Sequence, residues 1–360
     1  MAQMVGIKDV ARQAGVSVGT VSNVINRPDM VSEETRFRVQ AVIERLGYVR
    51  SESARQLRAG QSRIMALLVL DMGNPFFVDV ARGAERAARA AGLGVMVCNS
   101  GQSAAEEAEY LSLFAEQRVR GVLVTPADPT GANLAAFRRR SIPCVLVDRV
   151  GPVADSCSVS VDDVAGARLA VGHLLDIGHR VVAYVSGPMH LAQCRDRRTG
   201  ALAALAEREL PEDALTHIEA ARLDVESGRQ AGARLLALSR RPSAVFCAND
   251  LLALGVLQAM TSHRIRVPDS IAIVGYDDVD FAAAAAVPLS SVRQPRHQLG
   301  RAAAQLLVEE ALGGGTHRHR QVVFEPDLVI RASSQGRPRR PRRPRPVPAE
   351  TVPVVTETAS

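Results

Sequence analysis

Hydrophobic and polar positions change their spacing along the chain, and the change divides it into two parts. Up to about residue 50 the apolar residues recur at the helical spacing i, i+3, i+4 and i+7. From residue 64 onward, short apolar runs alternate with helix-length segments. This order predicts a small all-helical head followed by a larger α/β core.

Three amphipathic helices are predicted in the head. Their apolar stripes are Ile7, Val10, Ala11 and Ala14 in the first, Val21, Val24 and Ile25 in the second, and Phe37, Val39, Val42, Ile43 and Leu46 in the third. Between the first two lies Gly15-Val16-Ser17-Val18-Gly19, which matches the G-x-S-x-G pattern of a hydrolase nucleophile. That nucleophile needs a preceding strand, whereas a helix is predicted here. Ser17 is therefore expected to cap the second helix of a helix-turn-helix.

Seven apolar runs in the core have the length and composition of buried β-strands. They are "IMALLVL", "LGVMVC", "GVLVT", "PCVLVD", "VVAYVSG", "SAVFC" and "IAIVGYDD". Strands separated by helices indicate parallel βαβ units, and the number of runs suggests two lobes. Ligands bind beyond the carboxyl ends of such strands. The polar residues at those ends are accordingly site candidates: Asn74, Thr125, Asp148, Asn249 and Asp277. Asn74 precedes Pro75 and equally fits a helix cap.

Charge is concentrated at the two ends of the chain. Residues 1–63 hold ten Lys or Arg against six Asp or Glu, and residues 337–360 hold six Arg against two Glu, within a net charge of +6. A basic helix-turn-helix is the electrostatic footprint of a DNA-binding module. No run of residues is apolar enough to span a bilayer or to serve as a signal peptide, so we expect a cytoplasmic protein without membrane contact.

The residue types argue against an enzyme and against a bound cofactor. No G-x-G-x-x-G or P-loop pattern is present, and Lys8 in the head is the single lysine. The five cysteines are scattered and never spaced as C-x-x-C, and we expect buried thiols. His317 and His319 form the one close histidine pair, without a cysteine or carboxylate nearby in sequence. No metal site is predicted.

The stretches "IKDVARQAGVSVGTVSNVIN" and "VSEETRFRVQAVIERLGYVRSESARQLR" resemble the head of the lactose-repressor (LacI/GalR) family of bacterial transcription regulators. The resemblance implies phosphate contacts from Ser17, Thr20, Ser22 and Asn26, and base contacts from Val18, Gly19 and Asn23. Asn23 stands where Arg is frequent, which favours adenine over guanine in the operator. It further implies that Leu57, in a hinge helix, wedges into the minor groove; from the residues alone, Leu57 could instead pack on the core.

The resemblance continues through "NPFF", "RRTGALAAL", "CANDLLALG" and "VGYDDVDFA", which are similar to an effector-binding core of the periplasmic sugar-binding type, with two lobes of doubly wound parallel sheet. It implies effector contacts from Phe76, Phe77, Arg197, Asn249 and Asp277, with Asp162 a weaker candidate. Asn74 and Asp148 join this expected effector set because of their place at the strand ends. These donors and acceptors suit a sugar or polyol. Leu191 and Leu223 stand where purine-binding relatives use polar or aromatic groups.

The expected domains follow from these patterns. Residues 1–50 form the head and 51–62 the hinge helix and linker, while 63–334 form the core. Its N-lobe is expected at 63–161 plus 291–323 and its C-lobe at 162–290 plus 324–334. Residues 335–360, rich in Pro and Arg, are expected to form a disordered tail without the leucine heptads of a tetramerising coil, which favours a homodimer.

The sequence thus predicts a repressor in which a dimer binds a palindromic DNA operator and a small effector closes the two-lobed core. Two alternatives remain open. The regulator could respond to a partner protein or a non-sugar metabolite, or the chain could be a sugar-binding module with no role at DNA.

Overall fold

The computed structural model describes residues 5–48, 62–151, 155–313 and 317–335. The chain divides into two compact units, and the boundary in the sequence falls between Ser62 and Arg63. The predicted hinge helix with Leu57 and the tail beyond residue 335 lie outside the described residues. Within the described ranges, no helix is long and apolar enough to cross a membrane.

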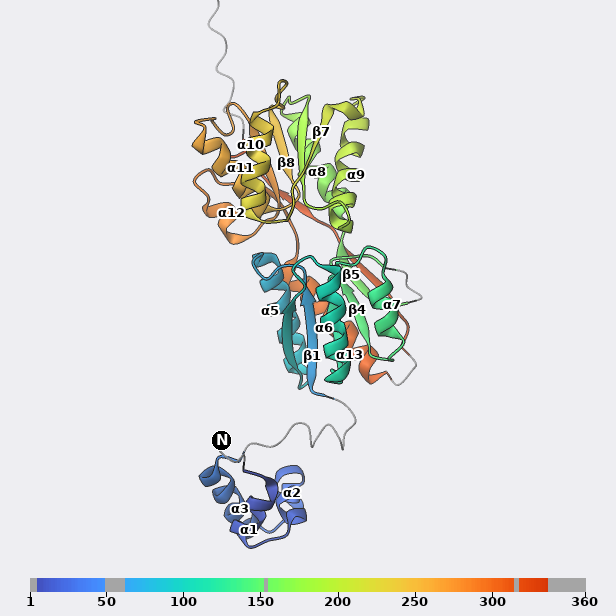
Figure 1. Ribbon diagram of the computed structural model, residues 1–360, viewed down its shortest axis with the longest axis vertical. Helices are drawn as coiled ribbons and strands as arrows, with labels where there is room; N and C mark the ends of the chain where they lie inside the picture. The colour runs from blue at the N-terminus through green and yellow to red at the C-terminus, as the bar shows by residue number, and fades with distance from the viewer. Residues whose placement is uncertain (1–4, 49–61, 152–154, 314–316, 336–360) are drawn as a thin grey trace, which may run out of the picture. The chain divides into compact units, whose positions relative to one another are not determined.

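The head is the predicted three-helix unit (Figure 1). It consists of α1 (Ile7–Ala14), α2 (Val18–Asn26), the short 3-10 helix η1 (Pro28–Met30) and α3 (Glu33–Leu46). Gly15 adopts φ +64°, a left-handed conformation that glycine tolerates, and ends α1 there. The helices enclose a core of Val10, Ala11, Ala14, Val21, Val24, Val39 and Val42.

The predicted apolar stripe of the third helix is wrong at one residue. Phe37 is 67% exposed and lies outside the core, with the Arg36 guanidinium 5.7 Å from its ring centroid. The reason is helical geometry: Phe37 precedes Val39 by two residues, or about 200° around the helix axis. Val39, Val42, Ile43 and Leu46 are correctly spaced for a single face, and they pack in the core.

The first lobe of the core contains a six-stranded sheet in the order β11-β5-β4-β3-β1-β2, and every pairing is parallel. Its strands are β1 (Ile64–Val69), β2 (Gly94–Asn99), β3 (Gly121–Val124), β4 (Cys144–Val147), β5 (Ser158–Val161) and β11 (Gln321–Phe324). Helices α5 (Pro75–Ala90) and α13 (Arg296–Leu312) cover one face, and α6 (Ala104–Glu116) and α7 (Ala132–Arg138) cover the other.

The second lobe contains a sheet in the order β12-β10-β9-β8-β6-β7, parallel except for β12 against β10. Its strands are β6 (Val182–Ser186), β7 (Leu215–Glu219), β8 (Ala244–Cys247), β9 (Ala272–Asp277), β10 (Ser290–Arg293) and β12 (Asp327–Val329). Its helices are α8 (Asp163–Asp176), α9 (Ala192–Ala206), η2 (Glu212–Ala214), α10 (Val225–Leu236), α11 (Asp250–Ser262) and α12 (Asp280–Ala284).

The chain passes between the lobes three times: from β5 to α8, from β10 to α13, and from β11 to β12. The second passage corrects the boundary expected at 290/291. All of β10 belongs to the second sheet, because Ser290 to Arg293 pair in register with Val274 to Asp277 of β9. The crossing therefore follows Arg293. The third passage follows Phe324, one residue later than expected.

Candidate functional site

Helix α2 separates its side chains into a buried and an exposed face. Val21 and Val24 are buried in the head. On the exposed side lie all the head residues predicted to contact DNA: Ser17, Val18, Gly19, Asn23 and Asn26 are exposed, and Thr20 and Ser22 are half-buried. The structure thus gathers these seven positions on and around one helix surface that is free to meet a ligand within the head unit.

Ser17 is the N-cap of α2, as predicted. Its Oγ accepts a hydrogen bond from the Thr20 amide at 3.0 Å and lies 2.9 Å from the Thr20 hydroxyl. The preceding element is helix α1 and not a strand, so the arrangement of a hydrolase nucleophile is absent here. A capped helix N-terminus carries partial positive charge, and its amides suit a phosphate group.

At the core, the carboxyl ends of the strands bring polar groups of the two lobes into contact. Asn74 follows β1 and Asp277 ends β9; the Asn74 Nδ2 donates to Asp277 Oδ2 at 3.0 Å. Asp148 follows β4, and its Oδ2 accepts from the Gln193 side chain of α9 at 2.9 Å. These two hydrogen bonds join the lobes, and they link side chains that are 203 and 45 residues apart in sequence. The region between the lobes around these four side chains is called the interlobe cleft below.

The two aspartates have unusual backbone conformations. Asp148 adopts φ +58° and Asp277 φ +104°, both in the region that side-chain-bearing residues avoid. Asp277 is held there by the Gln294 amide, which donates to its Oδ1 at 2.7 Å, and by Arg296, which donates to its carbonyl at 2.9 Å. Such strain concentrates where a side chain must be aimed at a ligand or a switch.

Arg197 is the buried cation of this cleft, at 4% exposure. Its Nε donates to Asp163 Oδ1 at 2.8 Å, and its guanidinium carbon lies 3.7 Å from the centroid of the Tyr276 ring. Its Nη1 donates to the Ala248 carbonyl. The Arg197 side chain is therefore fixed by the protein in three directions, and its charge lies near Asp148 and Asp277.

Sequence reasoning missed Asp163 and named its neighbour. Asp162 is exposed and caps α8, accepting from the Ala165 amide at 2.8 Å, whereas Asp163 is buried against Arg197. A signal was available, since Asp163, Ala167 and Ala170 share the i, i+4, i+7 spacing of the buried face of α8.

Three other residues predicted to contact the effector make contacts within the protein. Asn249 caps α11 by accepting from the Leu252 amide at 2.9 Å, and its Nδ2 donates to the Leu223 carbonyl at 3.1 Å. Phe76 and Phe77 are buried with their rings edge to face at 5.0 Å. The two phenylalanines belong to the hydrophobic core of the α/β unit. Asn74 also acts as a cap, accepting from the Phe76 amide at 3.0 Å.

Several buried polar atoms at the strand ends have no hydrogen-bond partner among the described residues. They include Asp148 Oδ1, Thr125 Oγ1 and Gln294 Oε1. An unpaired buried polar atom costs about 1–3 kcal/mol, and native proteins retain few of them. A polar ligand at this cleft would satisfy such atoms.

Burial, together with the Asp163 carboxylate, raises the pKa of Asp148 from 3.8 to about 8. The folded core therefore binds a proton more tightly than the unfolded chain between these values. The resulting stabilisation is complete below about pH 3.8 and is lost as the pH rises through about 8.

We accordingly expect Asp148→Asn to flatten the pH dependence of stability. Asparagine keeps a polar contact for Gln193 but cannot ionise. The melting temperature of the variant should rise relative to that of the unmodified chain between pH 6 and pH 9, by a few degrees. Thermal melts across this range test it, with exposed Asp213→Asn as a control for net charge. A constant difference at every pH would contradict the assignment.

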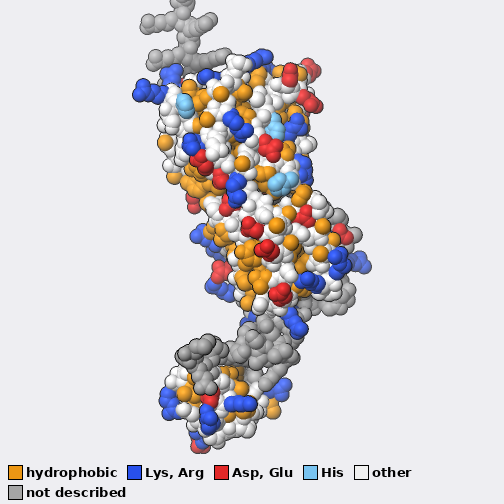
Figure 2. Space-filling model, in the orientation of Figure 1, with side chains coloured by type: hydrophobic (Ala, Val, Ile, Leu, Met, Phe, Trp, Pro, Cys, Tyr) orange, Lys and Arg blue, Asp and Glu red, His pale blue; other side chains and the backbone are white. Residues whose placement is uncertain are grey.

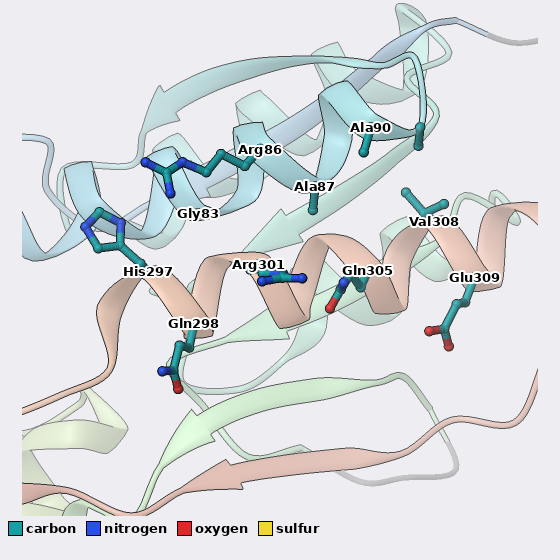
Figure 3. Close-up of a pocket in the computed structure, with 11 residues that line it drawn as sticks. Gly83, Arg86, Ala87, Ala90, His297, Gln298, Arg301, Gln305, Val308 and Glu309 are labelled. Atoms are coloured by element: carbon teal, nitrogen blue, oxygen red, sulfur yellow. The ribbon is translucent and has the colours of Figure 1, made fainter.

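A separate groove of about 710 Å³ lies on the surface of the first lobe, between α5 and α13 (Figure 3). Its lining includes Arg86, Ala87, His297, Arg301 and Gln305. None of the residues predicted to contact an effector lines it, so the interlobe cleft remains the candidate effector site.

Comparisons with known proteins agree with this architecture. Residues 6–51 match the model of the bacterial regulatory proteins, lacI family, and residues 171–334 match a periplasmic binding protein-like domain. The HTH-type transcriptional repressor PurR of Photobacterium profundum is 34% identical over 333 residues, which cover 92% of this chain and 98% of the relative.

Two solved structures extend the likeness. A transcriptional regulator CelR–cellobiose complex is 31% identical with a TM-score of 0.67, covering 91% of this chain and 99% of that one. The lac repressor dimer bound to operator and the anti-inducer ONPF is 26% identical with a TM-score of 0.79, covering 92% and 99%. The chain belongs to the lacI family of bacterial regulatory proteins, with a helix-turn-helix head and a two-lobed α/β core.

Proposed function

We propose that this chain is a transcriptional repressor that binds a palindromic DNA operator as a homodimer in the cytoplasm. The observation that carries the proposal is the exposed face of α2, where Asn23 and the capped N-terminus face away from the head core. Lys and Arg side chains stand around the face of the head seen in Figure 2. Positive charge of this kind supplies the sequence-independent part of DNA affinity.

A second copy of the chain would supply the other half of the palindrome. In support, β2 is an edge strand of the first sheet, and its apolar residues from Val95 to Cys98 are only half-buried. Apolar edges in soluble proteins are commonly covered by a partner. The lac repressor of similar structure is a dimer on its operator.

Asn23 should carry part of the sequence preference. We expect Asn23→Ala to weaken operator binding about 10- to 100-fold, because one good contact to a base edge is worth about 1–3 kcal/mol. Affinity for unrelated DNA should change little. Gln40→Ala, an exposed residue of α3, is the matched control. Titration of labelled DNA at fixed salt measures both, and equal losses on operator and random DNA would contradict a base contact.

For the effector we propose a sugar or other polyol bound between the lobes. The aspartates, the amides of Asn74 and Gln193, and the unpaired Asp148 Oδ1 offer closely spaced donors and acceptors for hydroxyl groups. The CelR neighbour was solved with cellobiose. The PurR relatives favour a purine-related effector as the second candidate. Leu191 is buried and Leu223 is half-buried, and neither side chain can hydrogen-bond to such a base.

An effector between the lobes would act by biasing their closure. Asn74, Asp148 and their partners already join the lobes, so a ligand that replaces or extends those bonds changes the relative stability of closed and open forms. Such coupling between two sites is typically about 1–3 kcal/mol. The head would then hold or release its operator accordingly.

Two experiments test the proposal. Genomic DNA fragments retained by the purified full-length protein should share a short palindrome, whereas purely salt-dependent, sequence-independent retention would argue against a specific operator. Thermal melts with sugars and purines in separate panels identify the effector class, since a ligand at 100 times its Kd adds about 2.7 kcal/mol. Stabilisation by purines alone would replace the polyol proposal. If no compound in either panel raised the melting temperature, control by a partner protein would be favoured.

A further inference from the structure

Four side chains with metal-binding chemistry converge in the first lobe, away from the interlobe cleft. They are Cys157, Glu310, His317 and His319, and one ligand atom from each lies within 4.8 Å of the others. Cys157 Sγ is 3.1 Å from His317 Nε2 and 3.8 Å from His319 Nδ1. Glu310 Oε2 lies 3.9 Å from the same His319 nitrogen. The fold has thus supplied the cysteine and the carboxylate that the histidine pair lacks in sequence.

These spacings fit a single tetrahedral ion. Zn²⁺ binds thiolate sulfur at about 2.3 Å and imidazole or carboxylate at about 2.0–2.2 Å, which separates the ligand atoms of one tetrahedron by about 3.3–3.7 Å. Three of the six separations between ligand atoms, at 3.1, 3.8 and 3.9 Å, lie close to that range, and all six are within 4.8 Å, so small side-chain shifts would complete the tetrahedron. One sulfur, two imidazole nitrogens and one carboxylate oxygen are a ligand set that suits zinc better than the hard ions Mg²⁺ and Ca²⁺.

The surroundings of the cluster also indicate a ligand. Cys157 is fully buried, and its sulfur accepts a hydrogen bond from the Arg320 amide at 3.4 Å. Glu310 Oε2 is buried without a hydrogen-bond partner in the described part of the chain. An open pocket of about 540 Å³, lined in part by Glu310 and both histidines, leaves a path for an ion from solvent.

The cluster lies where separate elements must be held together. Cys157 directly precedes β5, and His317 and His319 lie four and two residues before β11. The two strands pair through Ser158 and Gln321. Glu310 is in the last turn of α13. This is the sheet edge at which the strands begin, opposite to their carboxyl ends and to the cleft.

We propose that Cys157, Glu310, His317 and His319 bind one Zn²⁺ ion per chain. The ion clamps the end of α13 and the start of β11 to the start of β5. It stabilises the first lobe and takes no part in holding the effector. Because the ligands come from segments about 150–160 residues apart, binding also favours the folded state over the unfolded chain.

Cobalt titration of the reduced, metal-free full-length protein tests the site. Co²⁺ should bind with a stoichiometry of one per chain and give the visible bands of a tetrahedral site together with a thiolate-to-metal charge-transfer band. Cys157→Ser should abolish the charge-transfer band. His190→Ala, an exposed histidine outside the cluster, should leave both signals unchanged. A charge-transfer band that persists in Cys157→Ser would overturn the assignment, as would the absence of saturable binding.

Thermal melts with and without Zn²⁺ provide a second measurement that does not depend on the cysteine. Zinc should raise the melting temperature of the unmodified chain by several degrees, and EDTA should reverse the rise. The double variant His317→Ala, His319→Ala keeps the buried core intact. Its melting temperature should be the same with zinc as without it. Equal stabilisation of this variant and the unmodified chain would overturn the proposal.

Discussion

Arg197→Met should lower the free energy of unfolding of the core by about 3–5 kcal/mol, because removing one member of a buried ion pair leaves its partner unpaired. Arg197 is 4% exposed and is the cation that contacts Asp163, stacks on Tyr276 and lies near Asp148 and Asp277. Methionine replaces much of the packing volume but none of the charge. The remaining carboxylates would have to take up protons or admit water.

Chemical denaturation at neutral pH measures this loss. Arg168→Met is the matched control, since Arg168 pairs with Glu207 on the surface and both side chains are about half exposed. Exposed pairs of this kind contribute at most about 1 kcal/mol. Adding Asp163→Asn to Arg197→Met should restore part of the stability, which isolates the pair. A loss no larger than that of Arg168→Met would show that the charge at Arg197 is not needed.

The second large effect is expected at Gly300, where α13 crosses α5. A Cβ atom at Gly300 would overlap the Val80 carbonyl oxygen, and one at Gly83 would overlap that of His297, so each helix uses a glycine to approach the backbone of the other. The overlapping atoms are backbone carbonyl oxygens, which cannot move away by a change of rotamer as a side chain can. Gly300→Ala should therefore cost about 3 kcal/mol, at the upper end of overpacking effects.

Gly172→Ala separates this effect from the general preference of helices for alanine. Gly172 also lies in a helix, but a Cβ there meets the end of the flexible Arg208 side chain at 3.1 Å. We expect this variant to be neutral or up to about 1 kcal/mol more stable. Denaturant melts compare the two. If Gly300→Ala also gained stability, the close approach of α5 and α13 would not be as the structure has it.

The sequence was informative wherever a local pattern determines the structure. The apolar stripe before Gly15 predicted that Ser17 caps a helix, and the structure confirms this. The seven predicted apolar runs are all strands. Five strands were not predicted: β5, β7, β10, β11 and β12. In β5 and β10 the reason is that Ser158, Ser160, Ser290 and Ser291 interrupt the apolar character, although all four are buried. Pairing with neighbouring strands determines these segments, and no local signal reports it.

The site shows the same limit at longer range. The strand ends pointed to Asp148 and Asp277. That Gln193 pairs with the first and Asn74 with the second became clear only once the two lobes were placed in three dimensions. Phosphate and base contacts by α2 and effector contacts in the cleft stay predictions. His317 and His319 had no partner within reach in sequence, and only the pairing of β5 with β11 brings Cys157 to them.

The order in which the chain crosses between the lobes bears on its synthesis. The first sheet receives β11, and the second receives β12, from residues 321–329, after nearly the whole core has been made. Until residue 324 is made, β5 has an open edge, and until residue 312 is made, α5 lacks the cover of α13. A nascent or truncated chain ending near residue 290 therefore has neither lobe complete. Such chains expose strand edges and apolar faces that attract chaperones and proteases.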